Sequence, residues 1–279
     1  MIIDFHTHIL PPRFKNHREE YLEMDASFAE LYSDPKSKII SAENLIDSMD
    51  INGIDISVVM GIGWSNIEIA MEANDYIIDS IQRYPTRLVG FFSVNPAWGE
   101  SALKEMDRCS IAGLRGIGEL HPTTQGFSMK EKNILEPFMS KASQMNMIVL
   151  THASEPVGHL YKGKGHNTPE ELWSLLQWAS KTTIVLSHWG GGIHFYSLMP
   201  EVKDAMKNVY LDTAASSLLY SPNVFSISSQ LMETEKILFG TDYPLINQKD
   251  LLIQVRNSSI TSSGKSNILG DNAINLLGL

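Results

Sequence analysis

The segment MIVLTHASEPVGHLYKGKGHNTPEELWSLLQWASKTTIVLSH (147–188) contains two short apolar runs with one helical pattern between them. Both runs, MIVLTH and TIVLSH, are rich in branched apolar residues, which is typical of buried strands. Between them, Thr168 is suited to cap a helix, Pro169 to occupy its first position and Glu171 to complete a capping box. The segment therefore predicts a strand–helix–strand unit with parallel strands.

The same alternation of strand-like and helical patterns recurs along the 279 residues. Eight strands are predicted, at 2–5, 56–61, 87–94, 113–120, 147–152, 183–188, 209–214 and 237–242. Helical patterns lie between them, for example at 42–53 and 66–84. Eight such units favour an α/β fold, a closed (β/α)8 TIM barrel, as a single domain over residues 1–279. The alternation alone also allows a doubly wound sheet, but no glycine-rich phosphate-binding sequence follows an early strand.

Residues 9–40 form a long charged and aromatic segment directly after the first predicted strand. An insertion of this length is usually functional or disordered. Because segments that follow the strands lie at the C-terminal mouth of a barrel, we expect this insertion to act as a lid or substrate wall. The alternative is a solvated excursion without a role in binding.

The composition argues against several classes of partner. A formal net charge of −10 is unfavourable for binding nucleic acid or an anionic membrane surface, which both require basic patches. No apolar stretch approaches the ~20 residues of a membrane span, and no basic signal-peptide region is found at the N-terminus. The single cysteine, Cys109, permits no intrachain disulfide and is expected to be a small buried residue. We therefore expect a cytoplasmic location.

Titratable residues end the otherwise apolar strands. His6 and His8 end the first strand, and because residues i and i+2 of a strand share one face, both imidazoles can bind one metal ion. His152 ends the fifth strand and Asp242 the eighth, so a third imidazole and a carboxylate can complete a site with an open position for water. A metal lowers the pKa of such a water, and Asp242 is the candidate to accept its proton.

Several motifs together resemble the amidohydrolase superfamily. They are HTH (6–8), THAS (151–154), SHWGG (187–191), FGTDYP (239–244) and ILGDNAINLLGL (268–279). The resemblance is closest to the branch that includes aminocarboxymuconate-semialdehyde decarboxylase and many uncharacterised metal-dependent hydrolases with a TIM barrel. It extends over almost the whole chain and is more specific for the superfamily than for the reaction.

The resemblance implies roles for the residues at the strand ends. It implies four metal ligands, namely His6, His8, His152 and Asp242. His188 is similar to the sixth-strand histidine, which contacts substrate or the activated water in mononuclear members and holds a second metal in binuclear ones. The bridging carboxylated lysine of many members is absent, and Glu119 stands in its place, as in the TatD-type branch. The site is therefore expected to hold one divalent ion or two, with Glu119 either bridging them or contacting the ligands or the substrate.

Zinc is the expected ion because the ligands are histidines and carboxylates, with manganese, iron and cobalt as alternatives. The leading hypothesis is a hydrolase that uses metal-activated water on an ester, lactone or amide-type bond, with Asp242 and His188 as catalytic residues. The alternative is a lyase, a non-oxidative decarboxylase of an unsaturated carboxylic acid, and a minor alternative is a non-catalytic binding protein. The partner is expected to be a small molecule that could carry a carboxylate, and the resemblance to dimeric relatives implies a homo-oligomer.

Other polar residues are weaker candidates. His121 lies in a loop just past the fourth strand, where it either faces the same mouth or, as the loop position favours, is exposed at the surface. Lys162 and Lys164 lie in a glycine-punctuated loop, where they either grip a substrate carboxylate or stay solvated. Asp212 could orient a ligand histidine, and His194 could reach the pocket from the segment after the sixth strand.

Overall fold

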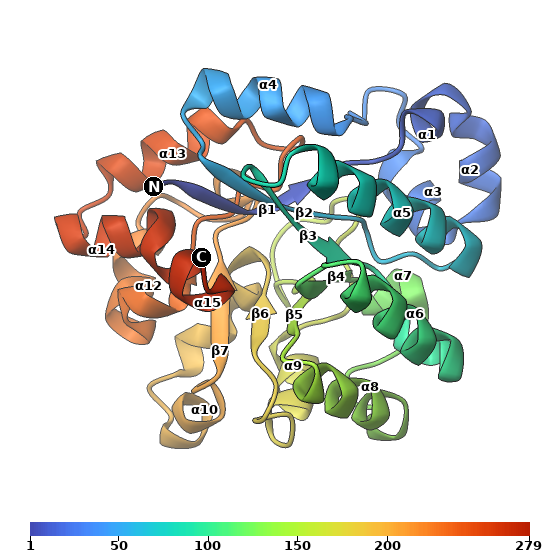
Figure 1. Cartoon of the computed structure of the whole chain (residues 1–279). Coiled ribbons are helices and arrows are strands. Elements are labelled where there is room, and N and C mark those ends of the chain that lie inside the picture. The colour runs from blue at the N-terminus through green and yellow to red at the C-terminus, as the bar shows by residue number, and fades with distance from the viewer.

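The centre of the structure is a parallel sheet whose eight strands neighbour one another in chain order. The computed structural model describes all residues, 1–279. The strands are β1 (Ile3–His8), β2 (Ile56–Met60), β3 (Leu88–Phe92), β4 (Gly116–Leu120), β5 (Ile148–Thr151), β6 (Ile184–Leu186), β7 (Val209–Asp212) and β8 (Ile237–Leu238). The chain after β8 returns to β1, where the amide of Phe5 donates to the carbonyl oxygen of Phe239 at 2.7 Å and Thr7 pairs with Tyr243. The sheet thus closes on itself, and the predicted (β/α)8 TIM barrel is confirmed (Figure 1).

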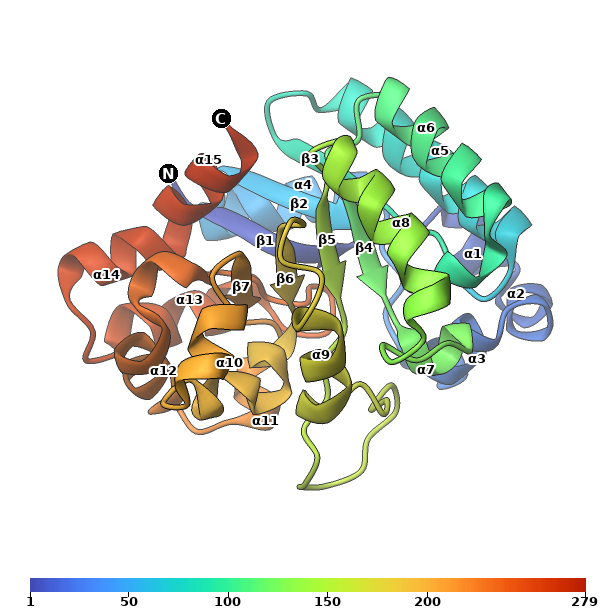
Figure 2. The same cartoon turned by 90° about the horizontal axis from the view of Figure 1, so that it is seen from below.

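Helices surround the barrel, as the view from below shows (Figure 2). The longer ones are α4 (Ala42–Asn52), α5 (Ile67–Arg83), α6 (Glu100–Ile111), α8 (Lys132–Gln144), α9 (Pro169–Leu176), α12 (Val224–Met232) and α13 (Gln248–Asn257). The shorter ones are α1 (Pro12–Asn16), α2 (Arg18–Met24), α3 (Ala26–Tyr32), α7 (Pro122–Gln125), α10 (Pro200–Ala205), α11 (Ser216–Leu219), α14 (Ser262–Ser266) and α15 (Asn272–Leu277). Tighter or wider helical turns form η1 (Pro96–Trp98), η2 (His188–Tyr196), η3 (Thr234–Lys236) and η4 (Asn267–Asp271). No helix has both the length and the apolar character needed to cross a membrane.

Apolar residues at helical spacing face the barrel. In α5, Ile69, Ala73 and Ile77 are buried, while Glu68 and Glu72 on other faces are not. This is the arrangement that an amphipathic pattern predicts, because burial of the apolar stripe drives helix packing. The helices contribute to one continuous core with the outer faces of the strands.

The prediction of a capping box at the start of α9 is wrong. Thr168 does occupy the N-cap position, but its side chain makes no capping hydrogen bond. The carboxylate of Glu171 instead accepts hydrogen bonds from the side chain of Ser128 and the amide of Met129. The helix ends at Leu176. A tertiary partner has displaced the local contact that the sequence pattern predicts.

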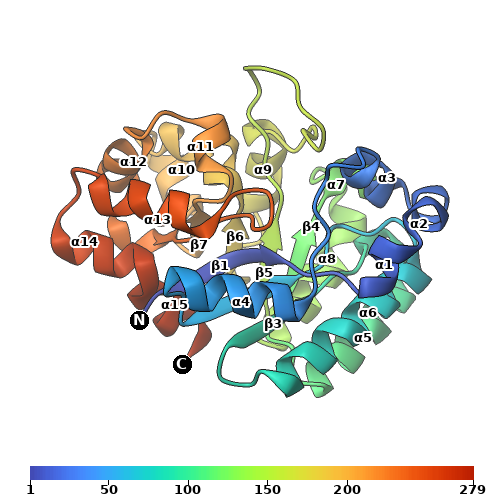
Figure 3. The ribbon, with the colours of Figure 1, turned by 90° about the horizontal axis from the view of Figure 1, so that it is seen from above.

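The insertion after β1 folds into a small aromatic unit. The rings of Phe14 and Tyr21 stack at 3.9 Å, and Phe28 and Trp64 complete the cluster. The carboxylate of Asp25 caps α3 and accepts amide hydrogen bonds from the β2–α5 loop, which attaches the insertion to the barrel. Figure 3 shows α3 next to α7, so the insertion flanks the C-terminal ends of the strands. The insertion is therefore packed on the barrel and is not a solvated excursion.

Candidate metal centre

All six residues predicted for the site come together at the C-terminal ends of the strands. His6 and His8 lie on β1 and Glu119 lies on β4, whereas the other three residues lie in the loops after strands. His152 directly follows β5, His188 is two residues past β6 and Asp242 is four residues past β8, because these last two strands end earlier than predicted. Five of the side chains are buried, and that of Asp242 is 14% exposed. The closed barrel explains this convergence, because parallel strands place all their carboxyl ends at one mouth.

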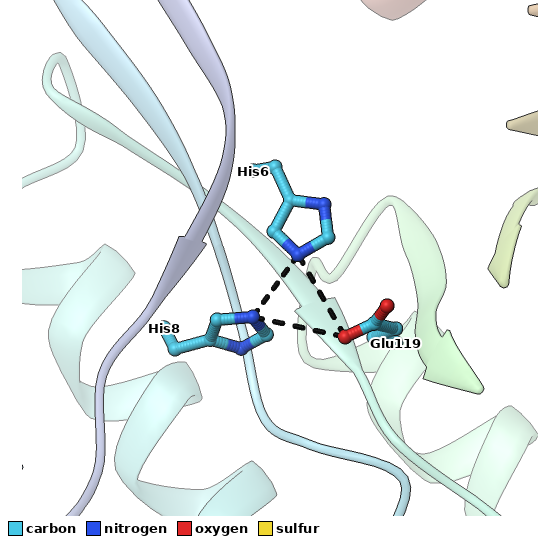
Figure 4. A group of neighbouring side chains, drawn as sticks. All are labelled: His6, His8 and Glu119. Carbon is cyan, nitrogen blue, oxygen red and sulfur yellow. Dashed lines mark hydrogen bonds and ion pairs between the residues drawn. The ribbon is translucent and has the colours of Figure 1, made fainter. Parts of the chain in front are cut away.

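A first group of ligand atoms surrounds the two histidines of β1. The Nε2 atoms of His6 and His8 lie 3.0 Å apart, and one oxygen of Glu119, Oε2, lies 3.7 Å from each (Figure 4). Asp242 Oδ1 lies 3.3 Å from Nε2 of His8. The Nδ1 atoms of both rings face acceptors, a carboxylate for His6 and the carbonyl of Gly61 for His8, so Nδ1 carries the hydrogen in each. The two Nε2 atoms therefore face each other, and either a proton on His6 or a metal ion between them would remove their repulsion.

A second group surrounds the other oxygen of Glu119. Its Oε1 lies 3.1 Å from Nδ1 of His152 and 3.5 Å from Nε2 of His188. The Nδ1 atom of His188 donates to the carbonyl of Ala214 at 3.2 Å, which leaves its Nε2 facing the site. The Nε2 atom of His152 is buried without a hydrogen-bond partner. Burial lowers the pKa of His152 to about 3, so the ring is neutral at pH 7 and keeps a lone pair for a ligand.

The charges of the cluster support the binding of a cation. Burial alone would lower the pKa of His6, but Asp212 and Glu119 raise it well above its usual value. Burial would raise the pKa of Glu119, but its hydrogen bond to His152 and the charge of His6 hold it well below its usual value. The pKa of Asp242 is likewise lowered, since the adjacent histidines outweigh the effect of its burial. The site therefore stabilises ionised carboxylates around a positive charge, which fits a divalent ion.

A cavity of about 500 Å3 opens above the cluster. Five of the six residues line its floor, and Tyr32, Asp34 and residues 36–38 of the insertion contribute to its wall. Apolar side chains such as Leu218 and Leu245 line the opposite side. The expectation that the insertion forms a substrate wall agrees with this arrangement. The volume is suited to a small organic molecule.

A sequence model of the amidohydrolase family matches residues 3–279. The chain belongs to the amidohydrolase family. The resemblance inferred from the motifs is thereby confirmed. Among curated proteins, this amidohydrolase is 24% identical to the 2-amino-3-carboxymuconate-6-semialdehyde decarboxylase of Dictyostelium discoideum, over 99% of this chain and 91% of that protein.

Solved structures share the fold of this amidohydrolase. The 5-carboxyvanillate decarboxylase of Sphingomonas paucimobilis superposes with a TM-score of 0.83 at 16% identity, over 100% of this chain and 99% of that one. A dihydroxybenzoic acid decarboxylase of Polaromonas sp. JS666, with bound manganese and the inhibitor 2-nitroresorcinol, gives a TM-score of 0.77 at 19% identity, over 100% and 97%. At these identities the structural matches establish the fold.

Two aspartates support the cluster from outside the cavity. The contact foreseen for Asp212 is present, because its Oδ2 accepts from Nδ1 of His6 at 2.8 Å. Asp4, which the sequence analysis missed, accepts from the amide of Thr241 at 2.9 Å and from its hydroxyl at 2.6 Å. It thereby fixes the residue before Asp242. The sequence offered one indication of this role, because Asp4 is an acidic residue within an apolar strand, two residues before His6. Burial of such a carboxylate is unfavourable unless it accepts hydrogen bonds.

The weaker candidates fall in different places. His121 is buried, so the favoured surface position is wrong. The alternative, that it faces the mouth, is confirmed, because His121 lines the cavity and its ring packs on that of His152. Lys162 lines the cavity, whereas the ammonium of Lys164 donates to carbonyls of its own loop. His194 is buried between the carbonyl of Trp189 and a serine hydroxyl, and it is not among the cavity-lining residues.

Proposed function

We propose that this amidohydrolase is a metal-dependent, non-oxidative decarboxylase of an unsaturated or aromatic carboxylic acid. The observation that carries the proposal is that several relatives matching nearly the whole chain are named as decarboxylases of carboxylic acids, whereas two others are named only as amidohydrolases. The cavity agrees with such a substrate, because a flat acid can place its carboxylate on the histidine cluster and its ring against the apolar wall.

The residues that would hold the metal are those of the two groups. His6, His8 and Asp242 face one side of Glu119, and His152 and His188 face the other. With one oxygen turned to each side, Glu119 allows the same side chains to hold one ion or two. Zinc suits this ligand set, and manganese, the ion bound in the Polaromonas decarboxylase, is the second candidate. When bound, a divalent ion polarises oxygen atoms of the substrate as a Lewis acid.

The reaction requires a proton to be delivered to carbon. The bond between the unsaturated carbon and the carboxylate carbon breaks, CO2 leaves, and the electron pair that stays on the unsaturated carbon takes up one proton. Asp242 and His188 are the proton carriers in this proposal, because both line the cavity and both belong to the histidine–carboxylate cluster.

A hydrolase, which the sequence analysis favoured, would use the same side chains. Asp242 would then take a proton from water and return it to the leaving group, and His188 would stabilise the oxyanion. The ligand set is common to both reactions, so it does not distinguish them. The named relatives favour the lyase.

The test is release of CO2. Protein freed of metal and reloaded with Mn2+ or Zn2+ would be incubated with 5-carboxyvanillate, 2,6-dihydroxybenzoate and 2-amino-3-carboxymuconate-6-semialdehyde, and in parallel with esters, lactones and amides. We expect metal-dependent CO2 release from at least one acid and its loss in Asp242→Asn. Asp47→Asn, a change at an exposed position of α4, is the matched control and should keep the activity. Hydrolysis of the second panel without CO2 from the first would contradict the proposal.

A further inference from the structure

His121 is a buried histidine that the proposed chemistry does not use. It lies between β4 and α7 and is 4% exposed. Its backbone is fixed, because the amide of His121 donates to Oε1 of Gln125 at 2.9 Å and Gln125 is itself bonded to two carbonyls. Its side chain is therefore held in a defined position in the cavity wall.

The ring of His121 makes two contacts of different kinds. It stacks on the ring of His152, with centroids 4.3 Å apart and planes inclined by 18°. Its Nε2 atom lies 2.9 Å from the carbonyl oxygen of Gly163, so Nε2 carries the hydrogen and donates it. One side chain thus touches both a residue of the metal cluster and the loop between β5 and α9.

Gly163 is the point at which this loop is also tied to the insertion. Its amide donates to Oε1 of Glu30 at 3.1 Å, and the ammonium of Lys162 donates to the hydroxyl of Ser33 at 2.8 Å. Gly163 has a positive φ of 83°, and a Cβ there would lie 2.7 Å from the side chain of Leu31. The loop is therefore fixed against the cavity wall at Gly163, whose amide bonds to Glu30 of α3 and whose carbonyl bonds to His121. We call this the seated position of the loop.

The geometry points to His121 as a positioning residue that couples the seating of the β5–α9 loop to the orientation of His152. When the loop is seated, the bond to Gly163 sets the plane of the His121 ring, and the stack holds the ring of His152 against Glu119. When the loop lifts, the donor on Nε2 loses its partner and the stack loses its support. The inference rests on the proposed function only in taking His152 as a metal ligand.

Such coupling is reciprocal, so metal binding must also seat the loop. Trypsin can report this, because Lys162 and Lys164 both lie in the loop. In the unaltered protein, Mn2+ or Zn2+ should slow cleavage after these lysines about tenfold, which is a common size for coupling between two sites. A loop that is independent of the metal cluster would be cleaved at the same rate with and without metal.

Two substitutions separate the two contacts of His121. His121→Phe keeps a flat ring over His152 but lacks the donor, so metal should still bind while its protection of the loop is lost. His121→Gln keeps a donor at the same reach but lacks the ring, so metal affinity should fall about tenfold, as for loss of a group that orients a ligand. His17→Phe, at an exposed position, is the matched control. Equal protection by metal in His121→Phe and the unaltered protein would overturn the inference.

A third substitution avoids the core and keeps the test decisive if the His121 variants do not fold. Glu30→Ala removes the exposed anchor of Gly163 and has no contact with the metal cluster. It should speed cleavage of the loop and weaken metal binding together, whereas Glu23→Ala, an exposed acid on α2, should do neither. Faster cleavage with unchanged metal affinity would refute the coupling. Absence of metal binding in every protein would instead refute the proposed function, and the coupling with it.

Discussion

Nδ1 of His6 on β1 donates to Oδ2 of Asp212 on β7 at 2.8 Å, with both side chains fully buried. The other oxygen of Asp212 accepts from the amides of His188 and Ala214. The carboxylate of Asp212 therefore fixes both the orientation of the His6 ring and the backbone position of His188, after β6. Because the contact occupies Nδ1, it turns Nε2 of His6 toward the cluster.

Asp212→Asn should weaken metal binding about 10- to 100-fold, the usual effect of losing a partner that orients a ligand. The amide group has only one acceptor atom, so it cannot satisfy both His6 and the two backbone amides. Competition with a chromophoric chelator measures the affinity, with Asp47→Asn as the exposed control. An affinity within twofold of the unaltered protein would show that Asp212 does not orient His6.

Removal of the metal should lower the stability of the fold. The cluster buries two carboxylates and four histidines, and an ion that binds only the folded state stabilises it by about 2.7 kcal/mol at a free concentration of 100 times its Kd. Dialysis against a chelator should therefore lower the melting temperature, and Mn2+ or Zn2+ should restore it, as read by calorimetry. A melting temperature that does not respond to either ion would contradict a metal centre.

Gly191→Ala should destabilise the protein more than Gly53→Ala. Both glycines have a positive φ, 56° and 69°, so an alanine at either costs about 1–2 kcal/mol of backbone strain. A Cβ at Gly53 would meet nothing within 4 Å, whereas one at Gly191 would lie 2.4 Å from the carbonyl oxygen of Ser154. This overlap should add about 1–3 kcal/mol. Urea unfolding of the two variants measures the difference, and equal losses would show that the contact between the His152 and His188 segments can relax.

The burial of His194 should lower the free energy of unfolding as the pH falls below about 6.5. Burial lowers its pKa from 6.5 to about 4, although its bond to the carbonyl of Trp189 opposes this. Between these values the unfolded chain binds a proton at His194 that the folded chain does not, so stability falls as the pH falls from about 6.5 to about 4. His194→Gln should reduce the loss of stability between pH 7 and pH 5 by about 2 kcal/mol, as read by urea unfolding. An unchanged loss in the variant, with His17→Gln as control, would contradict this assignment.

The barrel and the positions of His6, His8, His152 and Asp242 could be predicted because they follow from local patterns. His188 and Glu119 were expected at the site from the family resemblance. Alternating strand and helix periods lead to parallel strands, and a closed parallel barrel brings every strand end to one mouth. His6, His8 and Asp242 needed no further information than their positions at the ends of apolar runs. The helix contact of Glu171 and the burial of His121 could not be predicted in this way, because each depends on a partner about 30 to 45 residues away.

The sequence by itself determined the fold and the chemical nature of the centre, since periodicity and residue type are properties of short segments. Only the tertiary structure decided that the two oxygens of Glu119 face different histidine pairs and that Asp212 orients the ring of His6. It also decided the contacts among the insertion, the loop at Gly163 and His121. These contacts join segments that are far apart in the sequence. Their distances depend on side-chain packing and hydrogen-bond satisfaction within the closed sheet, which no local pattern encodes.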